Sequence, residues 1–306
     1  MTTSPPTSLR LTAAISPVRH HQPLLNGDVT IPGVELSPVP PGRDYADRFK
    51  RMCRDLAFDV CELSVMSYFA AREYGLPISA IPVVPIHMFH HRDFLKNVHA
   101  GIESPKDLEG GRVGTRTYTV TPGVLDRGIL SGEFGVDLDT ITWVLAEPEH
   151  VAQVEDHYPD NVVPGKNENL FLRLASGDLD AGIAGSNLRG ERSPDVAPLF
   201  PDAAALDRLQ YERSGIVPAF TVITMRTALL EEHPWLAEAL YEAFAAARRD
   251  GVEPGAGVAE AVGGDDPSPF GLSANRASFA ELLALGREQK ILAGPMTVDD
   301  LFPALG

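Results

Sequence analysis

Short apolar strands followed at once by polar loops recur in both halves of this chain, and this recurrence limits the possible folds more than any other feature. Residues 9–15 alternate apolar and polar side chains as a strand does, and the polar run 19–22 follows. In the second half, the apolar stretch 112–115 leads into the polar run 116–121, and a helical pattern begins near Pro122. Strand, polar loop and helix in this order predict an α/β fold.

The length predicts two lobes rather than one. A chain of 306 residues exceeds what one hydrophobic core usually serves. The second lobe is expected to begin near Asn97, and the apolar run 217–225 is expected to return to the first. We therefore assign 1–96 and 218–306 to a discontinuous first lobe and 97–217 to the second. Further strands are predicted at 34–39, 58–63, 81–86, 139–144 and 178–184, helices at 44–55, 64–72, 170–176, 227–249 and 275–289, and a loop at 251–271.

The charge balance excludes two classes of partner. The chain carries 42 acidic and 26 basic residues, a formal net charge of −16. Such a surface repels phosphate backbones and anionic lipid, so we expect neither a nucleic-acid partner nor a membrane partner. It also means that basic groups must be concentrated locally wherever a small anion is held.

Nothing in the sequence predicts a secreted or membrane protein. The two cysteines, Cys53 and Cys61, cannot form a disulfide framework and are expected to be buried thiols. No apolar run approaches the roughly 18 residues that a membrane-spanning helix needs. Residues 1–11 lack the apolar segment of a signal peptide. We therefore expect a cytoplasmic protein.

The polar run after the first strand is a candidate binding loop. It contains Arg19, His20 and His21, and ligands of open α/β sheets lie just beyond the carboxyl ends of strands. A second candidate is the junction of strand 58–63 with the next helix, where Ser64 and Ser67 stand. Ser64 suits a helix cap, and both hydroxyls also suit a bound carboxylate at the helix N-terminus.

Histidines are concentrated in 87–92, where three of the nine lie beside an arginine. A metal site is one interpretation, but no Cys, Asp or Glu is taken to stand at ligand spacing, so no metal is predicted. Proton transfer or anion binding, with His87 and His91 on one side, is the favoured interpretation, and a structural role is the alternative. In the second half, Arg116, Tyr118, Thr119 and Thr121 suit an anion, although such a Thr-rich loop also suits a helix cap.

The chain resembles the 4,5-dihydroxyphthalate decarboxylases, whose fold is that of type 2 periplasmic binding proteins. The resemblance extends over about 290 residues, and the order of its motifs is more specific than any one of them. The matching stretches are 58–64 with Ser67 and Tyr68, Met88, Phe89 and His91, 107–110 with 112–114, 127–130, 177–181, 233–235, 269–272, Asn275 with Arg276, Glu288 with Gln289, and Leu301 with Phe302. It implies a two-lobed α/β fold with a ligand cleft between the lobes.

The departures from the family pattern concern the expected ligand contacts. The family's Asp-Arg-Thr-Arg after the first strand is replaced by the run 19–22, and its Arg-Met-Phe-Arg-His keeps only the last histidine, His91. A Glu-Tyr pair becomes Thr117-Tyr118, and a family histidine becomes Thr221. Because arginines that would hold a dicarboxylate have become histidines, we expect a substrate with less negative charge than phthalate.

The resemblance implies removal of CO2 from an aromatic ring after protonation of the ring carbon. Histidine suits such an acid, and the resemblance points to His91, with His21 and Glu62 orienting groups or relaying protons. The substrate-binding set is then Arg19, His20, Ser64, Ser67, His87, Arg116, Tyr118, Thr119 and Thr121. No cofactor motif is present in the sequence, and none is expected.

Two other functions fit the same scaffold. A solute-binding protein for a small carboxylate would have the same lobes, because a fold does not determine a function. A lyase or dehydratase of another kind is the second alternative. In each case the expected partner is a small-molecule carboxylate, and homo-oligomerisation is left open.

Overall fold

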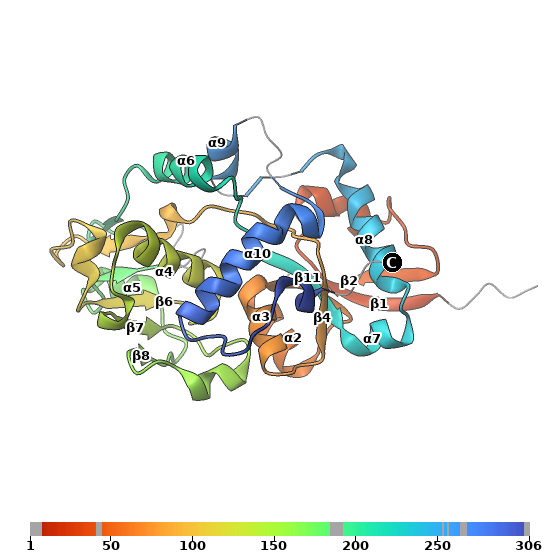
Figure 1. Cartoon of the computed structure of the whole chain (residues 1–306), viewed down its shortest axis with the longest axis horizontal. Coiled ribbons are helices and arrows are strands. Elements are labelled where there is room, and N and C mark those ends of the chain that lie inside the picture. Colours follow the sequence, from red (N-terminus) through yellow and green to blue (C-terminus); the bar gives the residue numbers. More distant parts are fainter. Residues whose placement is uncertain are drawn as a thin grey trace, which may run out of the picture.

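The computed structural model describes residues 8–40, 45–183, 192–252, 254–255, 257–263 and 268–302. They form two mixed sheets surrounded by helices (Figure 1). The first sheet has the order β2-β1-β3-β11-β4, with β1 (Leu9–Ala14), β2 (Val34–Pro38), β3 (Val60–Ser64), β4 (Ile78–Ile81) and β11 (Thr221–Arg226). The second has the order β10-β5-β9-β6-β7-β8, with β5 (Leu95–Asn97), β6 (Arg112–Thr115), β7 (Thr142–Leu145), β8 (Val162–Val163), β9 (Ala181–Gly182) and β10 (Val196–Pro198).

Neighbouring parallel strands in each sheet direct the loops that follow them to the same end of the strands. β1 is parallel to both β2 and β3, and β6 is parallel to both β7 and β9. β11 enters the first sheet antiparallel to β3 and β4, although it lies far from them in the chain. The domain boundaries at 96/97 and 217/218 stay predictions; the first strand of the second sheet begins at Leu95.

Helices cover the sheets and also link them. α10 packs against both α3 and α4, and Figure 1 shows it running across the middle of the molecule. The helices are α1 (Gln22–Leu25), α2 (Tyr45–Asp55), α3 (Val65–Glu73), α4 (Thr121–Phe134), α5 (Leu170–Ala175), α6 (Ala203–Ser214), α7 (Thr227–Glu232), α8 (Leu236–Ala247), α9 (Val258–Val262), α10 (Gly271–Glu288) and α11 (Val298–Leu301). Short 3-10 helices occur at Arg19–His21 (η1), His91–Asp93 (η2), Pro105–Leu108 (η3), Leu138–Thr140 (η4), Ala152–His157 (η5) and Arg248–Asp250 (η7).

One buried core continues through both halves. Phe69 of α3, Leu125 of α4 and Phe279 of α10 belong to the same apolar cluster, which also contains Trp143 of the second sheet. The end of α10 is joined to α4 by polar bonds as well, because the Gln289 side-chain amide donates to the Val124 carbonyl at 2.8 Å. The relative position of the two sheets is therefore set by buried contacts as well as by the connecting chain.

Four predicted elements need correction. The strand expected at 178–184 is limited to Ala181–Gly182, and residue 184 lies outside the described residues. The strand expected at 81–86 ends at Ile81, because Pro82 and Pro85 have no N–H to continue a ladder. The apolar run 217–225 becomes a strand only from Thr221. The interval 251–271, expected to be a loop, contains α9; its residues 253, 256 and 264–267 lie outside the described residues. The helix α6 was not predicted from the sequence.

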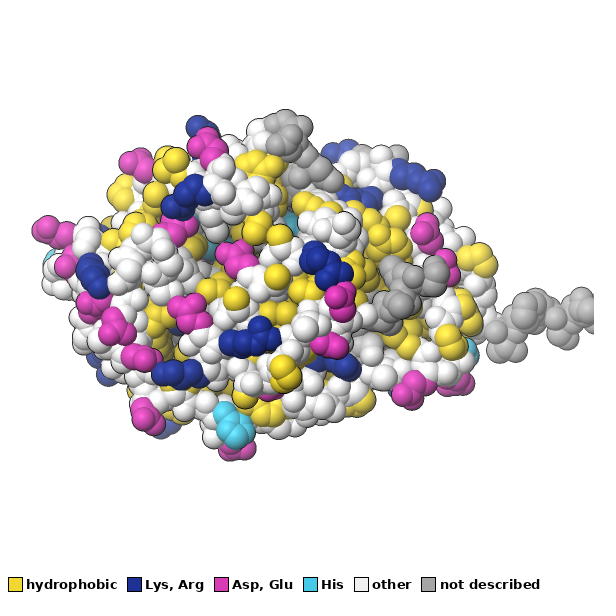
Figure 2. All heavy atoms as spheres, in the orientation of Figure 1, with side chains coloured by type: hydrophobic (Ala, Val, Ile, Leu, Met, Phe, Trp, Pro, Cys, Tyr) yellow, Lys and Arg dark blue, Asp and Glu magenta, His cyan; other side chains and the backbone are white. Residues whose placement is uncertain are grey.

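The surface agrees with the composition. Figure 2 shows acidic and basic side chains interspersed over one face rather than gathered by sign. Within the described ranges, no helix is both long and apolar enough to cross a membrane.

Candidate active site

Two helices from different halves begin at one point, where Ser64 meets Thr121. β3 ends at Ser64, α3 follows at once, and α4 begins at Thr121. The two hydroxyl oxygens lie 2.7 Å apart. The Thr121 hydroxyl accepts the Met66 N–H, and the Ser64 hydroxyl accepts the Thr121 N–H, both at 3.0 Å. Each hydroxyl therefore caps the other helix, and the N-terminal backbone donors of two helices converge here.

Ser64 thus differs from a simple cap of its own helix. It occupies the N-cap position of α3 but makes no side-chain bond to that helix. Thr221 lies directly opposite Ser64 in the ladder of β3 and β11, and its side chain is buried. Its hydroxyl has no hydrogen-bond partner among the described residues. A buried hydroxyl in this state is an available donor or acceptor for a ligand.

A buried carboxylate lies two residues before Ser64, on the same face of β3. Glu62 is fully buried, and its Oε2 accepts the Ser16 N–H at 2.8 Å and the Ser16 hydroxyl. Its Oε1 is also buried but has no hydrogen-bond partner among the described residues. The carboxyl end of β3 therefore presents an acceptor oxygen that a ligand donor would satisfy.

His21 lies beside this carboxylate, and His20 packs against His21 with their ring centroids 4.7 Å apart. The His21 Nδ1–H donates to the Ser16 carbonyl at 3.0 Å, and the His20 Nε2–H donates to the Pro85 carbonyl at 2.9 Å. Burial lowers the pKa of His21 from its usual 6.5 to about 4, although the Glu62 charge acts in the opposite direction. His21 is therefore neutral at pH 7. Arg19, in the same short helix, is exposed.

The neutral state of His21 predicts a pH-dependent loss of stability. Because its folded pKa lies below its unfolded value, its contribution to the free energy of unfolding is complete above about pH 6.5 and is lost as pH falls through about 4. The full loss amounts to about 3 kcal/mol. Urea unfolding between pH 8 and pH 4 should show a stability difference between the wild type and His21→Asn that shrinks on the acid side. His99→Gln, at an exposed histidine, is the control, and a difference independent of pH would contradict the prediction.

Ser67 links the first half to a histidine of the second. Its hydroxyl lies 2.8 Å from His150 Nδ1, and both residues are fully buried. A buried cation, Arg48 on α2, lies close enough to β3 to favour ionisation of Cys61, although burial raises the pKa of that thiol well above its usual value. Sequence reasoning missed both His150 and Arg48. Arg48 could have been found, because position 48 falls on the apolar face of its helix beside Phe49.

The donors of the polar loop 116–121 already bind a carboxyl group of the protein itself, although burial raises the pKa of that group, Glu149. The carboxylate of Glu149 accepts the Tyr118 N–H at 2.5 Å, the Thr119 N–H at 3.3 Å and the Thr119 hydroxyl. The Tyr118 hydroxyl donates to the Gln289 carbonyl at 3.2 Å, and Arg127 lies over its ring at 4.1 Å. The donors that were expected to bind substrate at Tyr118 and Thr119 are therefore occupied, and we do not place these residues in the site.

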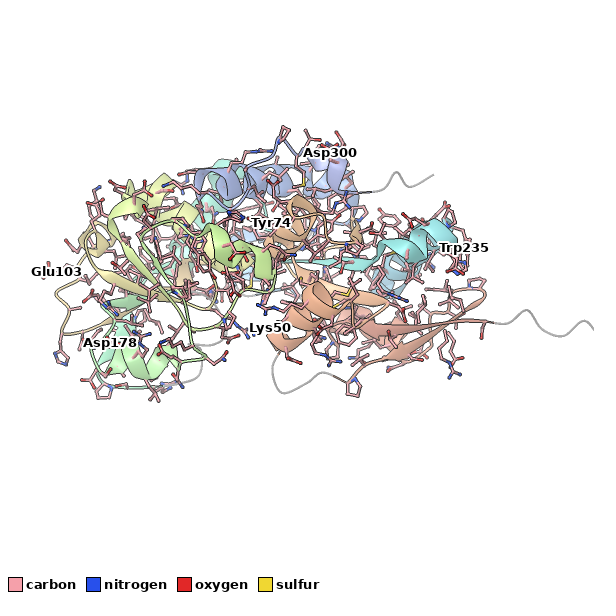
Figure 3. All side chains as sticks on the ribbon, turned by 90° about the horizontal axis from the view of Figure 1, so that it is seen from below. Lys50, Tyr74, Glu103, Asp178, Trp235 and Asp300 are labelled. Atoms are coloured by element: carbon pink, nitrogen blue, oxygen red, sulfur yellow. The ribbon has the colours of Figure 1, made fainter. Side chains whose placement is uncertain are left out.

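Arg116 lies nearer the surface than the residues that follow it. Its guanidinium pairs with Glu147, with a nitrogen–oxygen distance of 3.1 Å. Glu147 lines an open cavity of about 320 Å³ together with Lys50 of α2 and residues 167–169. Figure 3 shows Lys50 at the side of α2 that faces the second half. Arg116 is thus held by an acidic partner beside this opening.

The histidines of 87–91 have separate environments. The His87 Nε2–H donates to the Asn275 side-chain oxygen at 2.7 Å, which ties the chain to α10. The His91 Nδ1–H donates to Asp207 at 2.9 Å, and its Nε2–H donates to Glu133 at 3.3 Å. Burial alone would lower the pKa of His91, but the hydrogen bonds and charges of Asp207 and Glu133 outweigh it and raise the pKa. His91 is therefore held as a charged link between η2, α4 and α6.

The geometry does not bring His91 together with His21 and Glu62. Glu133, the partner of His91, lies twelve residues after Thr121 on α4, a distance of about 18 Å along the helix axis. Thr121, in turn, contacts Ser64 at the other end of the helix. The expectation that one catalytic group contains His91, His21 and Glu62 is therefore not supported by their positions.

Carboxylates do stand at ligand spacing from the histidines, contrary to the expectation from the sequence. Asp93 stands three residues after His90, and its carboxylate lies 2.9 Å from His90 Nδ1. Asp126 of α4 completes a buried group of one histidine and two carboxylates whose ligand atoms lie within 4.8 Å of one another. This group could hold a metal ion or, alternatively, orient the His90 ring.

Sequence comparison finds relatives over most of the chain, although no family model matches it. The chain is 34% identical to a 4,5-dihydroxyphthalate decarboxylase of Comamonas testosteroni over 248 residues, which are 77% of this chain and 74% of that protein. It is 33% identical to a 4,5-dihydroxyphthalate decarboxylase of Pseudomonas putida over 220 residues, which are 67% of this chain and 84% of that protein.

Structure comparison confirms the predicted two-lobed, periplasmic-binding-protein-like fold. The periplasmic aliphatic sulphonate binding protein SsuA of Escherichia coli matches with a TM-score of 0.56 and 13% identity, covering 98% of this chain and 93% of that one. A ligand-binding component of an ABC-type import system from Staphylococcus aureus matches with a TM-score of 0.55 and 11% identity, covering 97% of each chain. At such identities the likeness shows the fold alone.

Proposed function

The chain belongs to the 4,5-dihydroxyphthalate decarboxylase family, and from this premise we propose that it removes CO2 from a small hydroxylated aromatic or heteroaromatic carboxylic acid. The observation that supports a site for this reaction is the buried Oε1 of Glu62, which has no hydrogen-bond partner among the described residues and lies beside two converging helix N-termini. Oε1 of Glu62 can accept a proton from a ring hydroxyl, and the helix N-termini suit a bound carboxylate.

The carboxylate is proposed to bind where α3 and α4 begin. Both helices direct the positive ends of their dipoles at the Ser64–Thr121 contact, and an anion placed there would be stabilised by both. The N–H groups of Met66 and Thr121, now capped by the two hydroxyls, are the donors that the substrate would take over. Opening of this contact would admit the substrate, and closing it again would exclude water.

Glu62 is proposed to act on the ring hydroxyl. Ser16 holds Oε2 through two hydrogen bonds, which fixes the orientation of the whole carboxyl group and therefore of Oε1. A hydroxyl ortho or para to the departing carboxylate, once it gives its proton to Oε1, increases the electron density at the ring carbon. The hydroxyl of Thr221 is available to bind a second ring substituent.

The reaction then balances without an oxidant or reductant. Glu62 takes the hydroxyl proton, and a histidine imidazolium gives a proton to the ring carbon that carries the carboxylate. The bond to the carboxylate breaks, its electron pair restores the aromatic ring, CO2 leaves, and Glu62 returns its proton to the ring oxygen. Because protein acids and bases supply every proton, we propose that the reaction is independent of metal and organic cofactors.

The site also supports a substrate of modest negative charge. The polar groups proposed to contact it are mainly hydroxyls and backbone donors, and His21, the histidine beside Glu62, is neutral. Arg116 pairs with Glu147, and Arg19 is exposed. A monocarboxylate therefore fits this arrangement better than a dicarboxylate does.

Mass spectrometry of single reactions tests the proposal. The purified protein is incubated with 4,5-dihydroxyphthalate and with a panel of mono- and dihydroxybenzoates and hydroxylated pyridine carboxylates. We expect at least one acid to lose the mass of CO2, and we expect the monocarboxylates to react faster. Loss of water would indicate a dehydratase instead. Tight calorimetric binding without any product would indicate a solute-binding protein.

A further inference from the structure

We propose that His90 is the acid that protonates the ring carbon and that Asp93 is its positioning residue. This assignment rests on the proposed function. His90 is buried, its Nδ1–H donates to the Asp93 carboxylate at 2.9 Å, and the Asp93 side chain is fully buried. His90 matches none of the residues on which the family resemblance was based.

The second nitrogen of His90 provides the reason for the assignment. Nε2 is buried and has no hydrogen-bond partner among the described residues. A buried ring nitrogen without a partner costs free energy, and binding of a ligand can recover that cost. His91 differs in this respect, because both of its nitrogens contact carboxylates. Of the two neighbouring histidines, His90 is the one with a nitrogen available for chemistry.

The position of His90 along α4 also favours it over His91. Nδ1 of His90 lies 3.9 Å from Asp126, which is five residues after Thr121 and about 7.5 Å from it along the helix axis. The corresponding separation for the partner of His91 is about 18 Å. Because the two nitrogens of an imidazole point in nearly opposite directions, Nε2 of His90 faces away from Asp93 and Asp126.

This arrangement is the one that general acids of the histidine–carboxylate type use. The carboxylate holds Nδ1–H, which fixes the ring orientation and leaves Nε2 to exchange the reacting proton. In the imidazolium form, Nε2–H is the donor that has no partner in the part of the chain that the structure describes. It gives its proton to the ring carbon as the bond to the carboxylate breaks, and solvent restores it after CO2 has left.

A divalent cation in the His90–Asp93–Asp126 group is the competing interpretation. The ligand atoms lie within 4.8 Å of one another and come from two elements, as a metal site requires. The separation of 2.9 Å between Nδ1 and Asp93, however, is that of an ordinary hydrogen bond. A cation would also not explain why Nε2 has no partner within the described ranges, since Nδ1 is the nitrogen that faces both carboxylates.

The experiment uses ring-proton exchange as well as turnover. The acid that protonates this ring carbon in the substrate can also add a deuteron to the same carbon of the product, and its conjugate base can then remove the original proton. The aromatic product of whichever acid the wild type decarboxylates is incubated with enzyme in D2O, and exchange at that ring position is followed by proton NMR. We expect His90→Gln to lower both kcat and the exchange rate by at least about 100-fold. Calorimetric binding of the product should change by less than about threefold.

Two further variants keep the assignment testable. Asp93→Asn retains the acid but loses its orientation, so kcat should fall by about 10- to 100-fold with product binding retained. His99→Gln is the matched control, because His99 pairs with Asp195 at 3.1 Å on the exposed surface, and it should leave kcat and exchange unchanged. If His90→Gln does not fold, the same measurements on Asp93→Asn decide the question.

The outcomes separate this assignment from the proposed function. If the wild type releases CO2 and His90→Gln retains kcat and exchange within about threefold, only the His90 assignment is overturned. If the wild type decarboxylates no acid of the panel, the proposed function is overturned, and the His90 assignment that rests on it is overturned with it. Elemental analysis of the purified wild type, His90→Gln and Asp126→Asn tests the competing interpretation. One equivalent of a divalent metal in the wild type that is absent from both variants would overturn the proposal that His90 is the acid.

Discussion

Replacing Glu62 by glutamine is expected to lower kcat by at least about 100-fold, with little change in the binding of product. The amide has the shape of the carboxylate, and its oxygen can still accept the Ser16 N–H that now bonds to Oε2. It cannot take a proton from a ring hydroxyl, however, so the ring is no longer activated toward protonation. Steady-state decarboxylation of a hydroxylated acid, with product binding followed by calorimetry, measures both quantities.

A matched variant shows whether the effect belongs to the site. Glu35 lies on β2, in the same sheet, but its side chain is exposed and pairs with Arg10. Glu35→Gln should leave kcat unchanged. The proposed role of Glu62 is wrong if Glu62→Gln folds normally and turns over an acid at the wild-type rate.

Replacing His91 by glutamine is expected to reduce stability rather than chemistry. His91 donates to two carboxylates, and Asp207, the nearer one, is fully buried. Removing His91 leaves the buried Asp207 with Arg92 alone, at 3.3 Å, and the free energy of unfolding should fall by about 2 kcal/mol. The kcat of the folded fraction should stay within about threefold of the wild type. Urea unfolding and activity on the same samples give both numbers.

The pH dependence of this stability difference identifies its cause. The pKa of His91 is raised in the folded state, so its contribution is fully present below the unfolded pKa and is lost as pH rises through the folded pKa. The difference between wild type and His91→Gln should therefore be largest in mild acid and should shrink in alkali. A loss of kcat by about 100-fold at unchanged stability would instead return the role of proton donor to His91.

The parts of the site that the sequence could predict are those that depend on local patterns. The strands that became β1, β3 and β6 were visible from apolar runs, and the polar residues after them were correctly expected at strand ends. Ser64 and Thr121 could be identified as helix starts for the same reason. The structure places both at one point, where two halves of the chain meet.

The partners of the polar groups could not be predicted in this way. Tyr118 and Thr119 looked like an open anion site, yet a carboxylate some thirty residues away in the chain occupies their amides. His90 and His91 are adjacent and chemically identical in sequence. Only packing places a carboxylate at each nitrogen of His91, and it leaves Nε2 of His90 without a hydrogen-bond partner among the described residues.

By itself, then, the sequence determined the α/β class, the family, and the strand ends at which polar chemistry gathers, because periodicity and motif order are properties of neighbouring residues. The tertiary structure alone decided which of those polar groups remain available to a substrate. A hydrogen bond or ion pair forms wherever packing brings two groups together, and the partners of Glu62, His91 and Thr121 come from segments dozens of residues away.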